Sequence, residues 1–139
     1  MRFRTAAAVM ALAALAACGE SKSDTAMKDI CSARADISKQ VDQLEGLTLT
    51  SGTTNQVTDS LKAIRGDLSK IGDARKDLSG ERRKEVQSAN AEFVDTLRET
   101  AATVGRSASV ESAGSQLKAA FGTLKQSYQS TFGKLDCSS

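Results

Sequence analysis

The most reactive side chains of this sequence are its three cysteines, Cys18, Cys31 and Cys137. Histidine is absent, so the chain lacks the commonest general base and the commonest ligand of transition metals. A Ser/His/Asp triad, a Glu-x-x-His di-iron motif and a Cys-x-x-Cys-His haem site are therefore excluded. The chemistry that remains is thiol chemistry, and it depends on what each cysteine is bonded to.

Carboxylate pairs with the i, i+4 spacing of one helix face are the other candidates for catalysis. Asp73 with Asp77 and Glu81 with Glu85 have this spacing, but basic residues lie between them. We interpret both pairs as parts of solvated ion pairs. The glycines are scattered singly, so no loop resembles a phosphate-binding motif. We expect no enzyme, no metal site and no cofactor.

The residues before Cys18 form a three-part leader. Arg2 and Arg4 give a basic start, residues 5–14 are mostly apolar, and Leu15-Ala16-Ala17 directly precede the cysteine. This is the order of a secretory signal peptide. The apolar run is shorter than the ~20 residues that cross a bilayer, so a transmembrane helix is the weaker alternative. A plain secreted protein with a chance cysteine is the other.

The sequence Leu15-Ala16-Ala17-Cys18 resembles the lipobox of the bacterial lipoproteins. The resemblance covers roughly the first 20 residues and nothing beyond them. It implies that a diacylglycerol is attached to the Cys18 sulfur and that residues 1–17 are removed. It also implies that the protein is anchored to the cell membrane or the outer membrane, with its domain outside the cytoplasm.

Without residues 1–17 the chain has the size of one domain and a neutral balance of charge. The 19 basic residues fall to 17, equal to the 17 acidic ones. A neutral domain has no electrostatic attraction for nucleic acid. Residues 18–24 comprise the cysteine that the resemblance implies is lipidated and a stretch of small, polar and charged residues, which predicts a flexible tether. Ser23 or Asp24 is then expected to cap a helix.

Apolar residues recur at steps of three and four along four later stretches, which predicts four helices. We expect these helices near residues 25–45, 57–78, 81–104 and 109–135, joined by a loop at 46–54, a turn at 79–80 and a break at 105–107. The first stripe starts at Met27, and Ser79 is expected to cap the third helix. Gly66 and Gly72, in the second helix, suggest positions at which the backbone of another helix comes close. Short connections favour an all-α, antiparallel up-down-up-down four-helix bundle over residues 25–139.

Once Cys18 carries a lipid, Cys31 and Cys137 form an even pair in an oxidising compartment. Two buried free thiols are the alternative. An even number of antiparallel helices returns the chain to the end where it began, so both cysteines should lie at that end. We therefore predict a Cys31–Cys137 disulfide.

Basic residues gather where the second helix meets the third: Arg75, Lys76, Arg82, Arg83 and Lys84. This basic patch should lie at the anchored end, where each cation near anionic lipid can contribute ~1 kcal/mol. The interleaved acids leave a local excess of only one positive charge, so a solvated turn is the favoured interpretation. Arg75 occupies an apolar position of its stripe and should extend its guanidinium to water.

Two function classes remain. The first is a non-catalytic, membrane-anchored lipoprotein of the cell envelope that binds another envelope protein or has a structural role. The alternative is a small carrier or sensor that holds an apolar ligand between its helices. Its cavity would be lined by small residues, for which close helix packing is the favoured explanation: Ala33, Gly66, Gly72, Ala101, Ala113, Ala120 and Gly122. The apolar residues of the second helix recur in a seven-residue repeat, which could pack helices of two chains as readily as helices of one chain. The oligomeric state therefore stays open.

Overall fold

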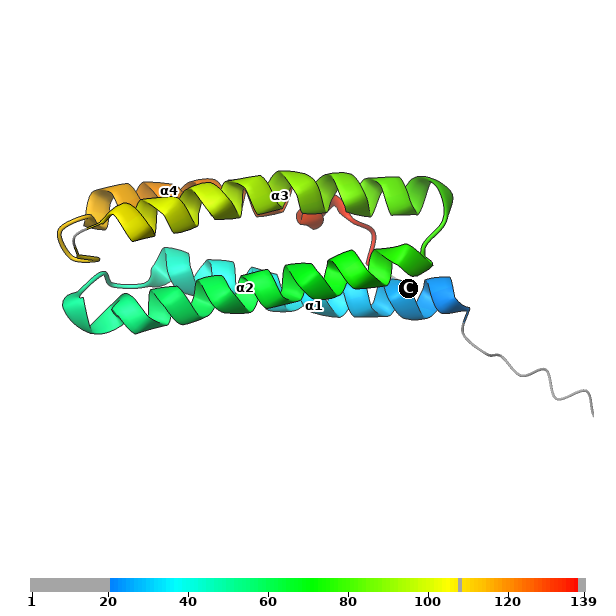
Figure 1. Ribbon diagram of the computed structural model, residues 1–139, viewed down its shortest axis with the longest axis horizontal. Helices are drawn as coiled ribbons and strands as arrows, with labels where there is room; N and C mark the ends of the chain where they lie inside the picture. Colours follow the sequence, from blue (N-terminus) through cyan, green and yellow to red (C-terminus); the bar gives the residue numbers. More distant parts are fainter. Residues whose placement is uncertain (1–20, 108, 138–139) are drawn as a thin grey trace, which may run out of the picture.

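The four amphipathic stretches fold into four long α-helices that run in alternating directions (Figure 1). A computed structural model describes residues 21–107 and 109–137. Its helices are α1 (Lys22–Gly46), α2 (Thr54–Ala74), α3 (Gly80–Arg106) and α4 (Gly114–Ser130). Three single 3₁₀ turns follow α1, α2 and α4, namely η1 (Ser51–Thr53), η2 (Arg75–Asp77) and η3 (Phe132–Lys134). The predicted all-α four-helix bundle is confirmed.

The core forms because each helix turns one apolar row toward the bundle axis. Phe93 of α3 lies at its centre, with Phe132 at 5.5 Å and Tyr128 at 6.2 Å between ring centroids, both edge to face. Such aromatic pairs stabilise a core beyond the area they bury. The other large, fully buried side chains are Ile30, Ile37, Val41, Leu44, Val57, Ile64, Ile71, Leu117, Phe121 and Leu124.

Helix α1 begins earlier than the sequence predicts. Ser21 is its N-cap, and the Ser21 hydroxyl accepts a hydrogen bond of 3.1 Å from the backbone N–H of Asp24. The predicted cap at Ser23 or Asp24 is therefore wrong, and the predicted tether is too long, because residues 22–24 are helical. The earlier start makes Ala26 the first buried residue, while Met27 packs at the edge of the core.

The turn between α2 and α3 is tight and depends on a glycine. Gly80 has φ +59°, a conformation that glycine adopts without steric cost. Ser79 occupies the N-cap position, but its side chain makes no capping hydrogen bond, so that part of the prediction is wrong. At the connection between α1 and α2, Leu47 and Leu49 are partly buried and pack against the core.

Helix α4 is shorter than the predicted 109–135. Residues before Gly114 form a turn in which the backbone N–H of Ser112 donates to the Ser109 hydroxyl at 3.0 Å. At the other end, Thr131 has φ −107° and ψ −89°, outside the helical region. The backbone N–H and the hydroxyl of Thr131 both donate to the carbonyl of Ser127, at 3.0 Å and 2.6 Å. Helix α4 ends here, and the chain after it crosses to α1 (Figure 1).

Gly66 and Gly72 do not mark a close helix contact. A Cβ atom added at either position would meet no heavy atom within 4 Å outside its own helix turn. The expectation that another backbone approaches these glycines is therefore wrong. Gly66 is exposed on α2, and Gly72 is partly buried beside a groove between α2 and α3, so both leave open space instead of bringing helices together.

Candidate functional site

The two ends of the bundle differ in what they carry (Figure 1). We call the end with the start of α1 and the α2–α3 turn the proximal end. The other, distal end carries residues 47–53 and 109–113, which connect α1 to α2 and lead into α4. Residues 1–17 and Cys18, with the predicted cleavage and lipid attachment, lie outside the described residues.

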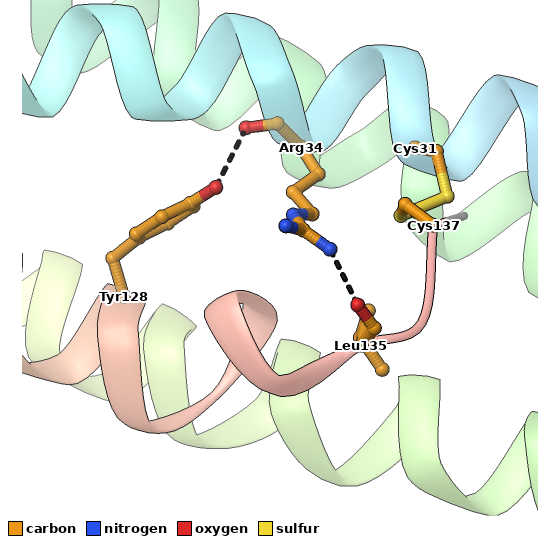
Figure 2. The surroundings of a disulfide bond; sticks show 5 residues. All are labelled: Cys31, Arg34, Tyr128, Leu135 and Cys137. Atoms are coloured by element: carbon orange, nitrogen blue, oxygen red, sulfur yellow. Dashed lines mark hydrogen bonds between the residues drawn. A yellow bond between two sulfur atoms is a disulfide. The ribbon is translucent and has the colours of Figure 1, made fainter.

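Cys31 and Cys137 form a disulfide, which confirms the predicted pairing (Figure 2). The two sulfur atoms are 2.08 Å apart and the two Cα atoms 5.7 Å apart, within the range of natural disulfides. The bond joins the third turn of α1 to the segment after η3, across 106 residues of sequence. Neither sulfur is then a free thiol that could act as a nucleophile or a metal ligand.

Arg34 binds the C-terminal segment one turn beyond the disulfide (Figure 2). Its guanidinium donates a hydrogen bond of 2.5 Å to the carbonyl of Leu135, and its own carbonyl accepts one of 3.3 Å from the hydroxyl of Tyr128. Arg34 was not among the predicted site residues. The signal was its spacing, since Arg34 follows Cys31 at i+3 and therefore shares its side of the helix.

The five residues of the basic patch lie in η2 and the first turns of α3, at the proximal end as expected. Arg75 is partly exposed and the other four are exposed. The ammonium of Lys76 lies 3.5 Å from Asp73, and that of Lys84 lies 3.8 Å from Glu81. These contacts to the interleaved acids agree with a solvated turn, because exposed pairs of this kind are weak and exchange with water.

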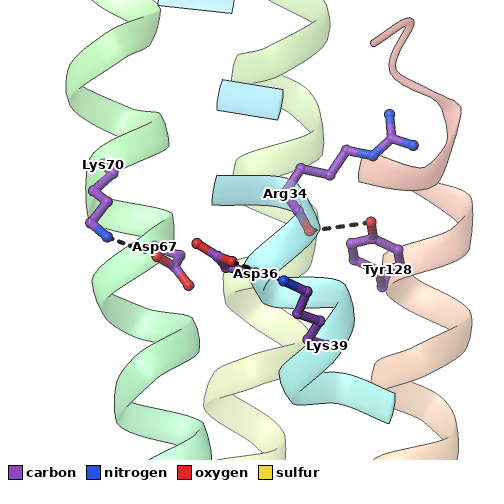
Figure 3. Close-up of polar contacts among 6 residues, drawn as sticks. All are labelled: Arg34, Asp36, Lys39, Asp67, Lys70 and Tyr128. Carbon is purple, nitrogen blue, oxygen red and sulfur yellow. Dashed lines mark hydrogen bonds and ion pairs between the residues drawn. The ribbon is translucent and has the colours of Figure 1, made fainter. Parts of the chain in front are cut away.

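Asp67 is a buried carboxylate that was not among the predicted site residues (Figure 3). It is 6 % exposed, and the ammonium of Lys70 lies 3.1 Å from its Oδ1 atom. Its burial could have been predicted from its spacing. Asp67 lies three residues after Ile64 and four before Ile71, so it shares the buried face of α2 with them. Lys70 itself remains mostly exposed, so the pair is in contact with solvent on one side.

Lys125 joins α4 to α1 toward the distal end. Its ammonium lies 2.9 Å from Glu45 and 3.5 Å from Asp42. The hydrogen bond to Glu45, followed by the charge of that carboxylate, raises the pKa of Lys125 above its ordinary value of 10.5. The charged lysine therefore bridges α4 and α1 at the partly exposed surface of the bundle.

The largest of the surface grooves described here lies between α1 and α2 at the distal end. It has a volume of about 870 Å³ and is open to solvent. Its walls carry amide and hydroxyl groups from Gln40, Gln43, Thr48, Thr53, Gln56 and Ser60, together with Asp42 and Asp59. Groups of this kind can form hydrogen bonds with a partner.

Two further observations concern membranes and metals. None of the helices in residues 21–107 and 109–137 has the length and hydropathy of a membrane span. In the same part of the chain, no three acidic or thiol side chains lie close enough together to hold a metal ion.

No family model, no curated protein and no solved structure matches this chain. Its function must therefore be argued from its own geometry and chemistry.

Proposed function

We propose that this protein is a bacterial lipoprotein anchored through Cys18, whose disulfide-closed bundle is a non-catalytic interaction module of the cell envelope. The disulfide is the observation that carries the proposal. Such bonds persist outside the reducing cytoplasm, which is where a chain with this leader would be exported. The lipobox and the disulfide are independent features of the sequence, and both point to the same compartment.

The short tether supports a fixed orientation. Ser21 caps α1, so three residues at most, Gly19–Ser21, separate an anchored Cys18 from the helix. At ~3.5 Å per residue, an extended chain of this length reaches only about 14 Å between Cys18 and Lys22. The proximal end would then face the membrane, and the distal end would point toward other envelope proteins.

The distal groove is the surface that such a partner would meet. Hydrogen-bonding side chains line it, and the exposed residues of the α1–α2 connection border it. Polar, solvent-open surfaces of this kind are typical of transient protein contacts rather than of obligate ones.

The packing of the core favours this module over a carrier of apolar ligands. Phe93, Phe121 and Phe132 are almost fully buried on the bundle axis, where a carrier would need space. Gly66 is exposed, and the partly buried Gly72 and Gly122 belong to different helices, α2 and α4. The small residues therefore do not converge on one ligand site.

Cell fractionation tests the anchor. The full chain should sediment with membranes and yield an acylated N-terminal peptide by mass spectrometry, whereas Cys18→Ser should remain unacylated. An unmodified Cys18 in the wild-type protein would refute the lipoprotein assignment.

Photo-crosslinking tests the partner surface in the same cells. A photoreactive residue at Thr48, exposed at the distal groove, should capture one specific envelope protein. The matched control is Gln129, an exposed residue of α4. Equal capture from both positions, or capture from neither, would reject the distal groove as the interaction surface.

A further inference from the structure

A second groove lies between α2 and α3, and its charge differs from that of the domain as a whole. Its volume is about 520 Å³, within the range of small-molecule sites. Four cations line it, Arg65, Arg75, Lys76 and Arg98, against one carboxylate, Asp73. This local excess of three positive charges stands out in a domain whose total charge is balanced.

The cations of this α2–α3 groove are available to a ligand. Neither Arg65 nor Arg75 forms an ion pair with another described residue. Lys76 contacts Asp73 at 3.5 Å, and Arg98 contacts Asp95 at 3.7 Å, but in both pairs the two side chains are highly exposed. Exposed pairs of this kind contribute little, so an incoming anion can replace them.

The floor of the α2–α3 groove is apolar and recessed. Leu68 and Leu97 are buried there beside the partly buried Val94. Gly72 deepens the groove, because no atom occupies the space that a larger side chain would fill. A ligand with a short apolar portion could therefore reach below the charged rim.

Asn90 contributes an unsatisfied hydrogen-bond acceptor to the same groove. Its Oδ1 atom is buried and has no hydrogen-bond partner among the described residues. A buried acceptor without a donor destabilises the folded state, so it calls for an explanation. A hydroxyl group of a bound ligand would satisfy it once the Asn90 side chain turns toward the groove.

We propose that the α2–α3 groove binds a phosphate ester with free hydroxyl groups, of the glycerophosphate type. Guanidinium groups bind phosphate with paired hydrogen bonds, which suits Arg65 and Arg75. A glycerol hydroxyl donates to Asn90, and the carbon chain lies over Leu68 and Leu97. The source of the ester is either a lipid headgroup or a soluble glycerophosphate.

The lipid source would extend the proposed function. Arg75 and Lys76 belong to η2 at the proximal end, so the groove begins at the end that would face the membrane. This part of the inference rests on the proposed anchor. The binding of a phosphate ester does not depend on the anchor, because all the residues that line the groove lie outside the lipobox.

The test uses the chain from Gly19 onward, which contains the whole buried core described above. The probes are vesicles of phosphatidylglycerol in phosphatidylcholine, vesicles of phosphatidylcholine alone, and glycerol 3-phosphate. We expect binding to the first or the third probe and not to the second. The double variant Arg65→Gln, Arg75→Gln should bind about tenfold more weakly, because hydrogen bonds to charged groups are strong.

The matched control removes two charges outside the groove, Lys62→Gln with Lys118→Gln, both at exposed positions. Its affinity should stay within about twofold, since screened surface charges act weakly. Asn90→Leu should bind about fivefold more weakly while remaining folded by circular dichroism.

Each outcome decides the proposal. Binding to phosphatidylglycerol vesicles with the expected losses supports a lipid headgroup as the source, and binding to glycerol 3-phosphate alone supports a soluble ester. Binding to neither probe, or equal losses in the groove variant and the control, overturns the site. An unchanged affinity in Asn90→Leu overturns the hydroxyl contact. Failure of Cys18 acylation would leave all these results standing.

Discussion

The guanidinium of Arg34 donates a 2.5 Å hydrogen bond to the carbonyl of Leu135, a residue 101 positions later in the chain. With the neighbouring disulfide, this contact fastens the C-terminal segment to α1 at two points one helical turn apart (Figure 2). The covalent bond limits how far the segment can move, and the hydrogen bond fixes its path over the helix.

Loss of the disulfide should destabilise the bundle strongly. By the chain-entropy model, a crosslink that closes a loop of this length contributes about 4–5 kcal/mol, because it restricts the unfolded chain. We expect Cys31→Ser with Cys137→Ser to lower the free energy of unfolding in urea by an amount of this order. Reducing agent should shift the wild-type curve similarly and leave the double variant unchanged. A reductant-sensitive double variant would contradict this explanation.

Arg34→Met should loosen the C-terminal segment without opening the bundle. The substitution removes the guanidinium that donates to Leu135 but retains the alkyl part of the side chain. It also retains the carbonyl of residue 34, which accepts the hydrogen bond from the Tyr128 hydroxyl. We expect a loss of about 1–2 kcal/mol in unfolding free energy. Amide hydrogen exchange should accelerate in residues 131–137, with α2 unaffected. Lys39→Met is the control, because Lys39 has only an exposed contact of 3.9 Å with Asp36. Equal exchange in both variants would argue against the Arg34 contact.

The raised pKa of Lys125 predicts a difference at alkaline pH. A folded-state pKa above 10.5 means that the ammonium stabilises the fold fully below that value. This contribution is lost as the pH rises through the folded-state pKa. The melting temperature of the wild type should therefore exceed that of Lys125→Met at neutral pH, and the gap should narrow above pH 10.5. Lys118→Met should show no such gap, and a gap independent of pH would refute the assignment.

Asn90→Leu should stabilise the protein. The replacement removes the buried, unpartnered Oδ1 atom and adds an apolar side chain beside Val94 and Leu97. We expect a gain of about 1 kcal/mol in a urea titration without ligand. Gln87→Leu, an exposed position one turn earlier on α3, serves as the control for added helix propensity and apolar area. A destabilised Asn90→Leu would show that the amide has a structural partner.

The sequence predicted the elements of the fold that depend on periodicity alone. The row of Val57, Leu61, Ile64, Leu68 and Ile71 is buried as its spacing required. The disulfide was also predictable, because an even helix count brings both cysteines to one end. These features depend on local spacing and on topology, and each can be read from one chain.

The helix ends and the polar contacts were harder to predict. Helix α4 stops at Ser130 because the backbone of Thr131 leaves the helical region, while Phe132 packs against Phe93. Phe132 and Leu135 continue the apolar steps of four and three after Tyr128, so the periodic pattern runs past the residue where the helix ends. Asp67 was overlooked because a carboxylate is expected on a solvated face. The α2–α3 groove was not predicted, because its cations come from two neighbouring helices. The apolar stripe of one helix does not show how the side chains of two helices lie relative to each other.

The Cys31–Cys137 bond also determines how the protein would carry mechanical force. A pull between the start of α1 and residue 137 would pass along Lys22–Cys31 and then directly through the sulfur–sulfur bond. Helices α2, α3 and α4 lie outside this load path. Only the first three turns of α1 would extend under tension, while the rest of the bundle keeps its shape.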